Sequence, residues 1–286
     1  MTLKELFTVY PQYLLPHHLL SQCMSKLTHC RKPQWKNAFI KLIIRLYGVN
    51  MAEAKNEELA AYDSFNHFFT RELKPGARGI APAADAIASP ADGAVSQAGL
   101  IEAGRIFQAK GHAYSTLELL GGDAERARLF ENGGFATIYL SPKDYHRLHM
   151  PLTGILKEMV HIPGRLFSVN AATAGAVPNL FARNERVACI FDTEAGPMAL
   201  ILVGAIFVSS VETVWHGVVT PPSINAPRSW QYEESAIRLE KGAEMGRFNM
   251  GSTIIVLFAK DKTAWSPELQ AGQPVRLGEM IGRCLF

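Results

Sequence analysis

NMGSTIIVLF, residues Asn249–Phe258, joins a small flexible pair to a run of strand-forming residues. The uncharged stretch Thr253–Phe258 is rich in β-branched and other strand-favouring side chains, which predicts a buried strand. Ser252 lies directly before this strand and after Gly251, whose missing Cβ lets another group approach its carbonyl closely. These residues alone fit either an ordinary turn that leads into a core strand or a hydroxyl nucleophile at the end of that strand.

The composition is that of a folded protein. The chain has 286 residues, of which 48% are hydrophobic and 19% are charged, enough for one large or two modest cores. A formal net charge of +3 is too small for a dedicated nucleic-acid binder. Cys23, Cys30, Cys189 and Cys284 show no CxxC spacing, which favours free thiols in a reducing compartment.

Neither a signal peptide nor a membrane-spanning helix is expected. Lys4 and Glu5 are followed by no continuous apolar region and no small-residue cleavage site. The uncharged run Gly196–Val211 is shorter than the roughly 20 residues of a spanning helix, and its Val, Ile and Phe content favours a buried strand. The sequence therefore predicts a protein of the cytosol or of a membrane surface.

The N-terminal part, residues 1–62, is expected to be helical. The segment Trp35–Tyr47 has apolar residues at helical spacing on one side and basic residues elsewhere, and Gly48 is the expected end. The apolar set is Trp35, Phe39, Leu42, Ile43 and Leu46, and the basic set is Lys36, Lys41 and Arg45. Such a helix is typical of a lipid headgroup layer, although the pattern also fits an ordinary helix packed on a domain.

The remainder, residues 63–286, is expected to form a mainly antiparallel β domain of sandwich or barrel type, which makes the whole chain α+β. Short apolar runs alternate there with Gly, Pro or Asp. The runs are Ala94–Ala98, Ile106–Ala109, Phe135–Leu140, Gly154–Val160, Val187–Phe191, Ala199–Val211, Thr253–Phe258 and Met280–Phe286.

Two polar stretches could supply catalytic groups. Asp92 belongs to an Asp-Gly pair, which is also a favoured hairpin turn. His146 and His149 share one face if they lie on a helical turn, which Pro151 would end. A metal site is poorly supported because no acidic third ligand is near, so acid–base chemistry is the better functional interpretation.

A third stretch combines polar donors with aromatic surface. It covers 163–170, where Phe167 and Ser168 lie, and 177–186. It fits a pocket wall for a polar headgroup beside an acyl chain, and equally a packed loop.

Asp92, His149 and Ser252 together could form a nucleophilic triad, although Ser252 lacks the G-x-S-x-G elbow. The Gly251–Ser252 bond itself is then the more interesting target.

Several motifs carry a family resemblance. They are FFTRELKPGAR (68–78), SPADG (89–93), YHRLHMP (145–151), GRLFSVN (164–170), VPNLFARNER (177–186), KGAEMGRF (241–248) and GST (251–253). In this order they resemble the proteobacterial type of phosphatidylserine decarboxylase proenzyme, over nearly the whole chain and most strongly from residue 63. The family's usual Leu-Gly-Ser-Thr is Met250-Gly251-Ser252-Thr253 here, and Met keeps the size and apolarity of Leu.

The resemblance implies that the chain cuts itself. Ser252 Oγ would attack the Gly251 carbonyl, with His149 as the base and Asp92 fixing the imidazole tautomer. β-Elimination and loss of ammonia would convert Ser252 into a pyruvoyl group at the start of an α chain, 252–286, cut from the β chain, 1–251. The predicted strand would keep the small chain bound in the sheet.

The resemblance also implies decarboxylation of phosphatidylserine to phosphatidylethanolamine and CO2. The pyruvoyl group would hold the substrate amine as a Schiff base and act as an electron sink, and no metal is expected. His146 is the candidate for assisting decarboxylation or reprotonation. Ser168 and Phe167 are the candidates for holding the substrate.

A two-chain lipid substrate favours a membrane-docking role for residues 1–62, on the cytoplasmic side of the cell membrane. Trp35 and Phe39 would enter the lipid, and Lys36, Lys41 and Arg45 would meet anionic headgroups. The expected partners are phosphatidylserine, the two chains of one precursor and a second copy in a homodimer.

Two other classes of function stay open. A serine hydrolase with Asp92, His149 and Ser252 would act on external esters or peptides and keep an intact chain. A membrane adaptor without enzymatic activity would use the Gly251–Ser252 turn only as structure. Ser252→Ala would then change nothing but stability.

Overall fold

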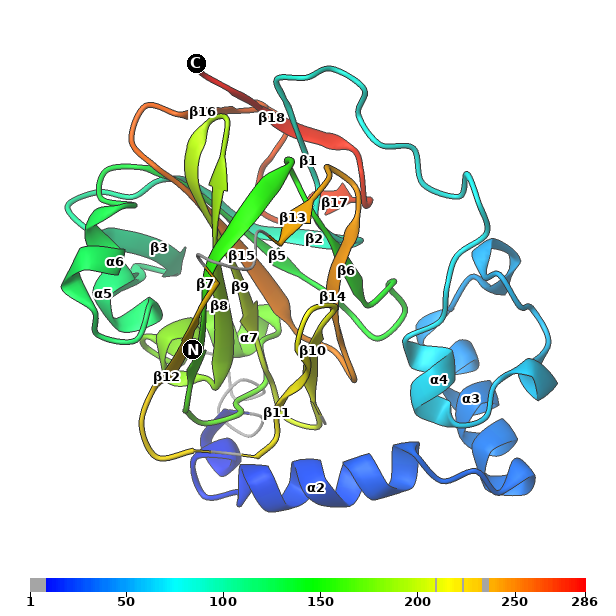
Figure 1. Cartoon of the computed structure of the whole chain (residues 1–286). Helices are drawn as coiled ribbons and strands as arrows, with labels where there is room; N and C mark the ends of the chain where they lie inside the picture. Colours follow the sequence, from blue (N-terminus) through cyan, green and yellow to red (C-terminus); the bar gives the residue numbers. More distant parts are fainter. Residues whose placement is uncertain (1–8, 209, 223, 233–236) are drawn as a thin grey trace.

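Figure 1 shows the computed structural model, which describes residues 9–208, 210–222, 224–232 and 237–286. The helices are η1 (Tyr10–Tyr13), α2 (His17–Thr28), α3 (Pro33–Tyr47), η2 (Met51–Glu53), η3 (Leu59–Ala61), α4 (Phe65–Phe69), α5 (Thr116–Leu119), α6 (Ala124–Arg128), α7 (Ala171–Ala174) and α8 (Leu180–Arg183), where η marks a 3-10 helix. The first nine strands are β1 (Ala86–Ala88), β2 (Gly93–Leu100), β3 (Arg105–Ala109), β4 (His112–Ser115), β5 (Gly134–Tyr139), β6 (Arg147–His149), β7 (Gly154–Ile162), β8 (Arg186–Thr193) and β9 (Gly196–Val203). The others are β10 (Val211–Thr213), β11 (Gly217–Thr220), β12 (Arg228–Gln231), β13 (Arg238–Leu239), β14 (Glu244–Phe248), β15 (Thr253–Phe258), β16 (Thr263–Trp265), β17 (Pro274–Val275) and β18 (Met280–Cys284).

The largest sheet of the described part has nine antiparallel strands, with β15 in its interior. Every residue of β15 has a partner on both sides, on β9 and on β5. Because successive side chains of a strand point to opposite faces, Ile254 and Val256 enter one core while Ile255 and Leu257 enter the other. Burial on both faces explains the unbroken apolar sequence of this strand, which was predicted correctly.

Smaller layers cover the two faces of the nine-stranded sheet (Figure 1). The sheet β11-β10-β14-β6 contributes Leu148, Met245 and Phe248 to one core, which the sheet β1-β18-β16 also joins. The pair β3-β4 and helix α8 contribute Tyr114 and Phe181 to the other core. The α+β fold class is therefore confirmed. Among the described strands the sheets stay open and no barrel closes, so the barrel alternative is wrong.

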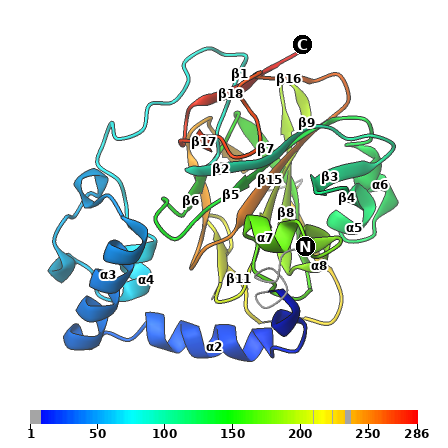
Figure 2. The same ribbon diagram turned by 180° about the vertical axis from the view of Figure 1, so that it is seen from behind.

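The N-terminal helices lie outside these sheets, and both views show α2 running beneath the β strands towards α3 and α4 (Figures 1 and 2). Helix α3 ends where expected, at Gly48, whose φ of 68° is a left-handed conformation that favours glycine. The helices enclose a core of their own, formed by Ile40, Val49, Tyr62, Phe65, Phe68 and Phe69, which we call the helical cluster. Met250 packs against the helical cluster, so the cluster contacts the chain directly before Gly251.

Three local predictions are wrong. Asp92-Gly93 makes no hairpin, because the strands around it, β1 and β2, belong to different sheets. The glycine is needed for close strand packing instead, since a Cβ at Gly93 would stand 2.3 Å from Tyr139 O. His149 ends strand β6, so the two histidines share no helical turn. The run Ala199–Val211 is also not one strand, because β9 ends at Val203 and β10 begins at Val211.

Candidate active site

Both sides of the Gly251–Ser252 bond are anchored. Asn249 accepts a hydrogen bond of 2.9 Å from Asn66 Nδ2 on α4. The Ser252 carbonyl accepts one of 2.9 Å from Leu140 N, and the fully paired strand β15 follows. Ser252 itself is completely buried, and its Oγ has no hydrogen-bond partner among the described residues. A cut at this bond would leave both new chain ends held in place.

The residue before this pair is strained. Met250 has a φ of 112°, in a region that residues with a side chain rarely adopt. Backbone strain of this kind persists only where the surroundings enforce it, and it concentrates at functional sites. Here the Met250 side chain is held by its packing against the helical cluster.

His146 lies against Gly251. A methyl group added at Gly251 would stand 3.7 Å from His146 Nε2. The imidazole Nδ1 is 2.9 Å from Asp144 O, which can only accept, so we assign the proton to Nδ1 and a free lone pair to Nε2. Burial lowers the pKa of His146 to about 3, which keeps the ring neutral at pH 7. Its Nε2 is buried and, within the described residues, unpartnered.

His149 has the same tautomer. Its Nδ1 is 2.8 Å from Gly242 O, which can only accept, so Nδ1 again carries the proton. The Tyr145 hydroxyl lies 3.3 Å from Nε2 and donates to it. Burial lowers the pKa of His149, which favours the neutral form. This is the tautomer that a base acting through Nε2 needs, and a backbone carbonyl fixes it.

Asp92 does not fix the tautomer of His149. Its Oδ1 accepts from Arg78 Nε at 2.9 Å and from Leu277 N at 2.8 Å, and its Oδ2 accepts from Arg78 Nη2 at 2.5 Å. In the described structure Asp92 makes no hydrogen bond with His149, so that predicted contact is wrong. The cause is the planar guanidinium of Arg78, whose two donors match both carboxylate oxygens. Asp92 reaches His149 only through its charge, which opposes the effect of burial on the pKa of His149.

A cavity of about 460 Å³ leads to Gly251. Ser168 lines it, as the prediction of a substrate-holding role requires, but no contact tests that role. The remaining walls are largely apolar and come from α3, α4, the chain before α7 and the chain after β9. They include Ile43, Tyr47, Phe65, Phe69, Val169, Ile206 and Phe207. Tyr47 and Phe207 are also exposed, so the cavity has an apolar rim.

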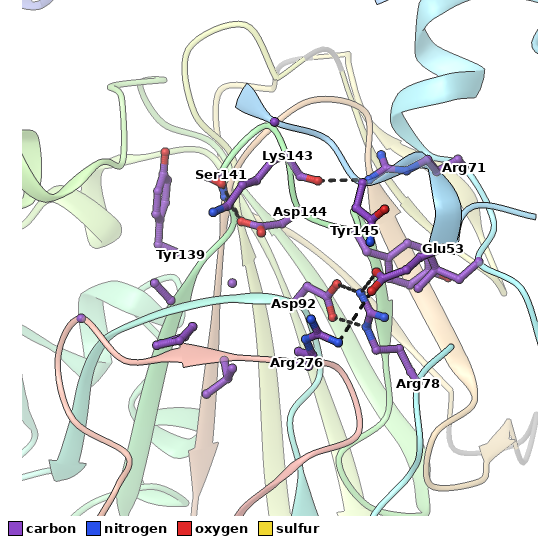
Figure 3. A pocket seen from close by; sticks show the side chains of 18 residues that line it. Glu53, Arg71, Arg78, Asp92, Tyr139, Ser141, Lys143, Asp144, Tyr145 and Arg276 are labelled. Carbon is purple, nitrogen blue, oxygen red and sulfur yellow. Dashed lines mark hydrogen bonds and ion pairs between the residues drawn. The ribbon is translucent and has the colours of Figure 1, made fainter. Parts of the chain in front are cut away.

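A second cavity, of about 670 Å³, lies on the Asp92 side of the segment 139–145 (Figure 3). Asp144 lines it and accepts from Ser141 N and Ser141 Oγ, both at 2.7 Å. Burial raises the pKa of Asp144. Arg71, Arg78 and Arg276 bring positive charge to the same walls. We call it the charged cavity.

Three residues of this site were not predicted from the sequence: Arg71, Arg78 and Asp144. Arg71 and Arg78 lie in the motif 68–78, in which Thr70 separates Arg71 from Phe69, and nothing in that pattern distinguishes a buried guanidinium from an exposed one. No pattern in the sequence marked Asp144, and its burial is visible only in the structure.

Two predicted contact residues are buried elsewhere. Phe167 is fully buried between Tyr13 and Arg183 and does not line the cavity at Gly251. Lys36 is only 5% exposed, and its Nζ donates to Leu59 O at 2.8 Å. A substrate contact through Phe167 and a membrane contact through Lys36 are therefore wrong for this structure.

No group of three or more His, Cys, Asp or Glu side chains is placed to hold a metal ion in the described residues. The described helices include none that is both long and apolar enough to span a bilayer.

Comparison with known proteins gives one consistent family. A family model described as phosphatidylserine decarboxylase matches residues 65–283, and a model described as PSD matches residues 7–48. A phosphatidylserine decarboxylase proenzyme from Pseudomonas fluorescens is 61% identical over 98% of this chain and 97% of that protein. Proteins of the same name are 57% identical in Stutzerimonas stutzeri, over 98% of this chain and 95% of that protein, and 58% identical in Pseudomonas aeruginosa, over 98% of each.

Proposed function

This chain belongs to the phosphatidylserine decarboxylase family, and on that premise we propose that it cuts itself between Gly251 and Ser252 and then converts phosphatidylserine to phosphatidylethanolamine and CO2. The proposal rests on two neighbouring observations. Ser252 Oγ is buried and unpartnered in the described part, and the preceding residue, Gly251, lies near His146, whose Nε2 is also unpartnered there. Buried polar atoms without partners are costly and usually have a role.

Self-cleavage begins with attack of Ser252 Oγ on the Gly251 carbonyl carbon. A base takes the hydroxyl proton and returns it to the Ser252 nitrogen as the peptide bond breaks, which leaves an ester. We propose His149 as that base because its Nε2 is the accepting nitrogen, and His146 as the competing candidate because it lies closer to Gly251. Asp92 then acts through its charge, which favours the imidazolium that forms.

The second stage forms the pyruvoyl group. Loss of the Ser252 Cα proton expels the ester carboxylate, and hydrolysis of the resulting dehydroalanine releases ammonia. The site fits the group, because Gly251, the residue before Ser252, lies near an imidazole that can exchange a proton and lines a cavity. The pyruvoyl carbonyl supplies an electron sink for the pair left behind when CO2 departs.

His146 is our proposed proton carrier for decarboxylation. The substrate carbon must take up one proton for each CO2 released. A neutral imidazole with a free Nε2 can first accept a proton from the substrate ammonium and then give it to that carbon. The apolar walls of the cavity support this chemistry, since removal of water favours loss of the carboxylate charge.

The test of the function is product analysis. Purified protein incubated with phosphatidylserine vesicles is expected to release CO2 and form phosphatidylethanolamine in equal amounts. Release of free fatty acid or glycerophosphoserine would instead indicate the serine hydrolase. That alternative is less well supported because the relatives that match nearly the whole chain are named phosphatidylserine decarboxylase proenzymes.

We propose that residues 1–62 dock on the membrane, and that 63–286 carry the catalysis. Helix α3 buries Ile40 in the helical cluster and packs Phe39 and Ile43 against it, but α2 and α3 also leave several apolar side chains exposed. Ser21 and Lys36 are buried there. The exposed apolar side chains are Leu14, Leu19, Leu27, Trp35, Leu42, Leu46 and Tyr47. Tyr47 also lines the cavity that leads to Gly251, so a lipid surface on these helices would meet its rim.

The docking proposal predicts a loss of membrane binding from two surface changes. Leu42→Ser with Leu46→Ser is expected to weaken binding to phosphatidylserine liposomes at least about tenfold, since two apolar side chains no longer enter the lipid. Sedimentation with liposomes measures this, and self-cleavage should stay complete. Leu100→Ser is the matched control, because Leu100 and Leu46 are 66% and 65% exposed. Equal binding by all three proteins would contradict the docking surface.

A further inference from the structure

Arg71 is a buried cation with too few partners. It follows α4, is 3% exposed, and places its guanidinium over the Phe68 ring at 5.4 Å. One nitrogen, Nη2, donates to Lys143 O at 3.0 Å. Its Nε and Nη1 are buried without a partner among the residues that the structure describes, and no carboxylate pairs with it there. Burial accordingly lowers the pKa of Arg71 from its usual value.

The acidic side chains of the charged cavity already have hydrogen-bond or ion-pair partners. Glu53 accepts from Arg78 Nη2 at 2.8 Å and lies 3.6 Å from Arg276 Nη1. Asp92 is held by Arg78, and Asp144 by the hydroxyl and amide of a serine. Figure 3 shows these contacts around the cavity. The walls carry four basic side chains, Arg71, Arg78, Lys143 and Arg276, against three acidic ones, Glu53, Asp92 and Asp144. Arg71 and Lys143 have no ion pair within the described part of the chain.

Arg71 is also close to the reacting groups. Its charge is among the causes that lower the pKa of His146, after burial, so the two side chains lie within electrostatic reach. The Phe69 ring, two residues before Arg71, packs against the His146 ring at 4.1 Å. His146 Nε2 in turn lies near Gly251. Arg71 is therefore linked to the scissile bond through Phe69 and His146.

We propose that Arg71 and Lys143 bind the phosphodiester of the lipid headgroup, an inference that rests on the proposed function. The guanidinium of Arg71 keeps donors that are unpartnered in the described part and can each give a hydrogen bond to an anionic oxygen, and the flexible Lys143 adds a second charge. The substrate carboxylate is the wrong anion for this site, because a cation on it would stabilise the charge that decarboxylation must remove. The phosphodiester keeps its charge throughout the reaction. Arg71 therefore strengthens binding of the ground state and transition state equally.

Kinetics of the self-cleaved variants test this assignment. With dispersed short-chain phosphatidylserine, Arg71→Met should raise KM about 10- to 100-fold and change kcat less than about threefold. Lys143→Met, at an exposed side chain, should raise KM about threefold or more. Arg276→Met is the matched control from the same cavity, because Arg276 is 62% exposed and already pairs with Glu53. An unchanged KM in Lys143→Met, or a loss confined to kcat in Arg71→Met, would overturn the proposal.

Direct binding gives a readout that does not depend on turnover. Calorimetry with the wild-type protein should detect binding of glycerophosphoethanolamine. This binding should be lost in Arg71→Met, and it should weaken about threefold or more in Lys143→Met, which serves as the test where Arg71→Met does not self-cleave. Equal affinity for inorganic phosphate would contradict a headgroup site. A wild-type protein that forms no phosphatidylethanolamine would contradict the proposed function itself. An active wild type whose KM and headgroup binding match those of both variants would contradict only the role of Arg71 and Lys143.

Discussion

Ser252→Ala is expected to leave the chain in one piece and to abolish decarboxylation. Alanine offers no nucleophile for the Gly251 carbonyl, and without the cut no pyruvoyl group can form. The variant should fold, because it removes one buried oxygen that has no hydrogen-bond partner in the described structure. Gel electrophoresis of the denatured protein measures the cut, and headgroup analysis of the lipid measures turnover.

Ser252→Cys is the informative companion variant. A thiol can attack the same carbonyl, so this protein should cut itself at a reduced rate while Ser252→Ala does not. Decarboxylation by an uncut Ser252→Ala protein would refute the account. Cleavage of Ser252→Ala at the same bond would point to another nucleophile.

His146→Gln is expected to lower decarboxylation by about 10²- to 10⁴-fold in the fraction of protein that has cut itself. Glutamine keeps a hydrogen-bonding side chain of similar length but cannot carry a proton. When the pH falls through 6.5, protonation of His146 should cause no loss of wild-type activity, because burial lowers the pKa of His146 to about 3. Rates per cleaved molecule, with cleavage measured by mass, separate this effect from processing.

Substitution of His149 is expected to block self-cleavage rather than decarboxylation. His149→Ala should leave the chain largely uncut, since its Nε2 is the proposed acceptor of the Ser252 proton. His216→Gln, at an exposed histidine between β10 and β11, is the control for a histidine substitution as such. A reversed pattern, in which His146→Gln stays uncut and His149→Ala cuts itself without decarboxylating, would exchange the two assigned roles.

The sequence predicted best what depends on local pattern. Strand Thr253–Phe258 was predicted with the correct bounds because its composition reports burial on both faces. The end of α3 at Gly48 was predicted because a left-handed cap favours glycine. Both features are decided within a few residues of chain.

Contacts between distant segments could not be predicted in the same way. Asp92 pairs with Arg78 rather than His149, and a carbonyl at Gly242 orients the imidazole. Lys36 belonged to the polar set of an amphipathic pattern, yet α3 turns it inward to Leu59 O. Periodicity shows that a helix has two faces, but only packing decides which of them meets the protein.

The intact mass of the denatured wild-type protein tests the central claim most directly. The account predicts two chains, 1–251 and 252–286, with the smaller one lighter by one ammonia than a peptide that begins with serine. A single uncut chain that decarboxylates phosphatidylserine, or a small chain that begins with an unmodified Ser252 in active protein, would contradict it.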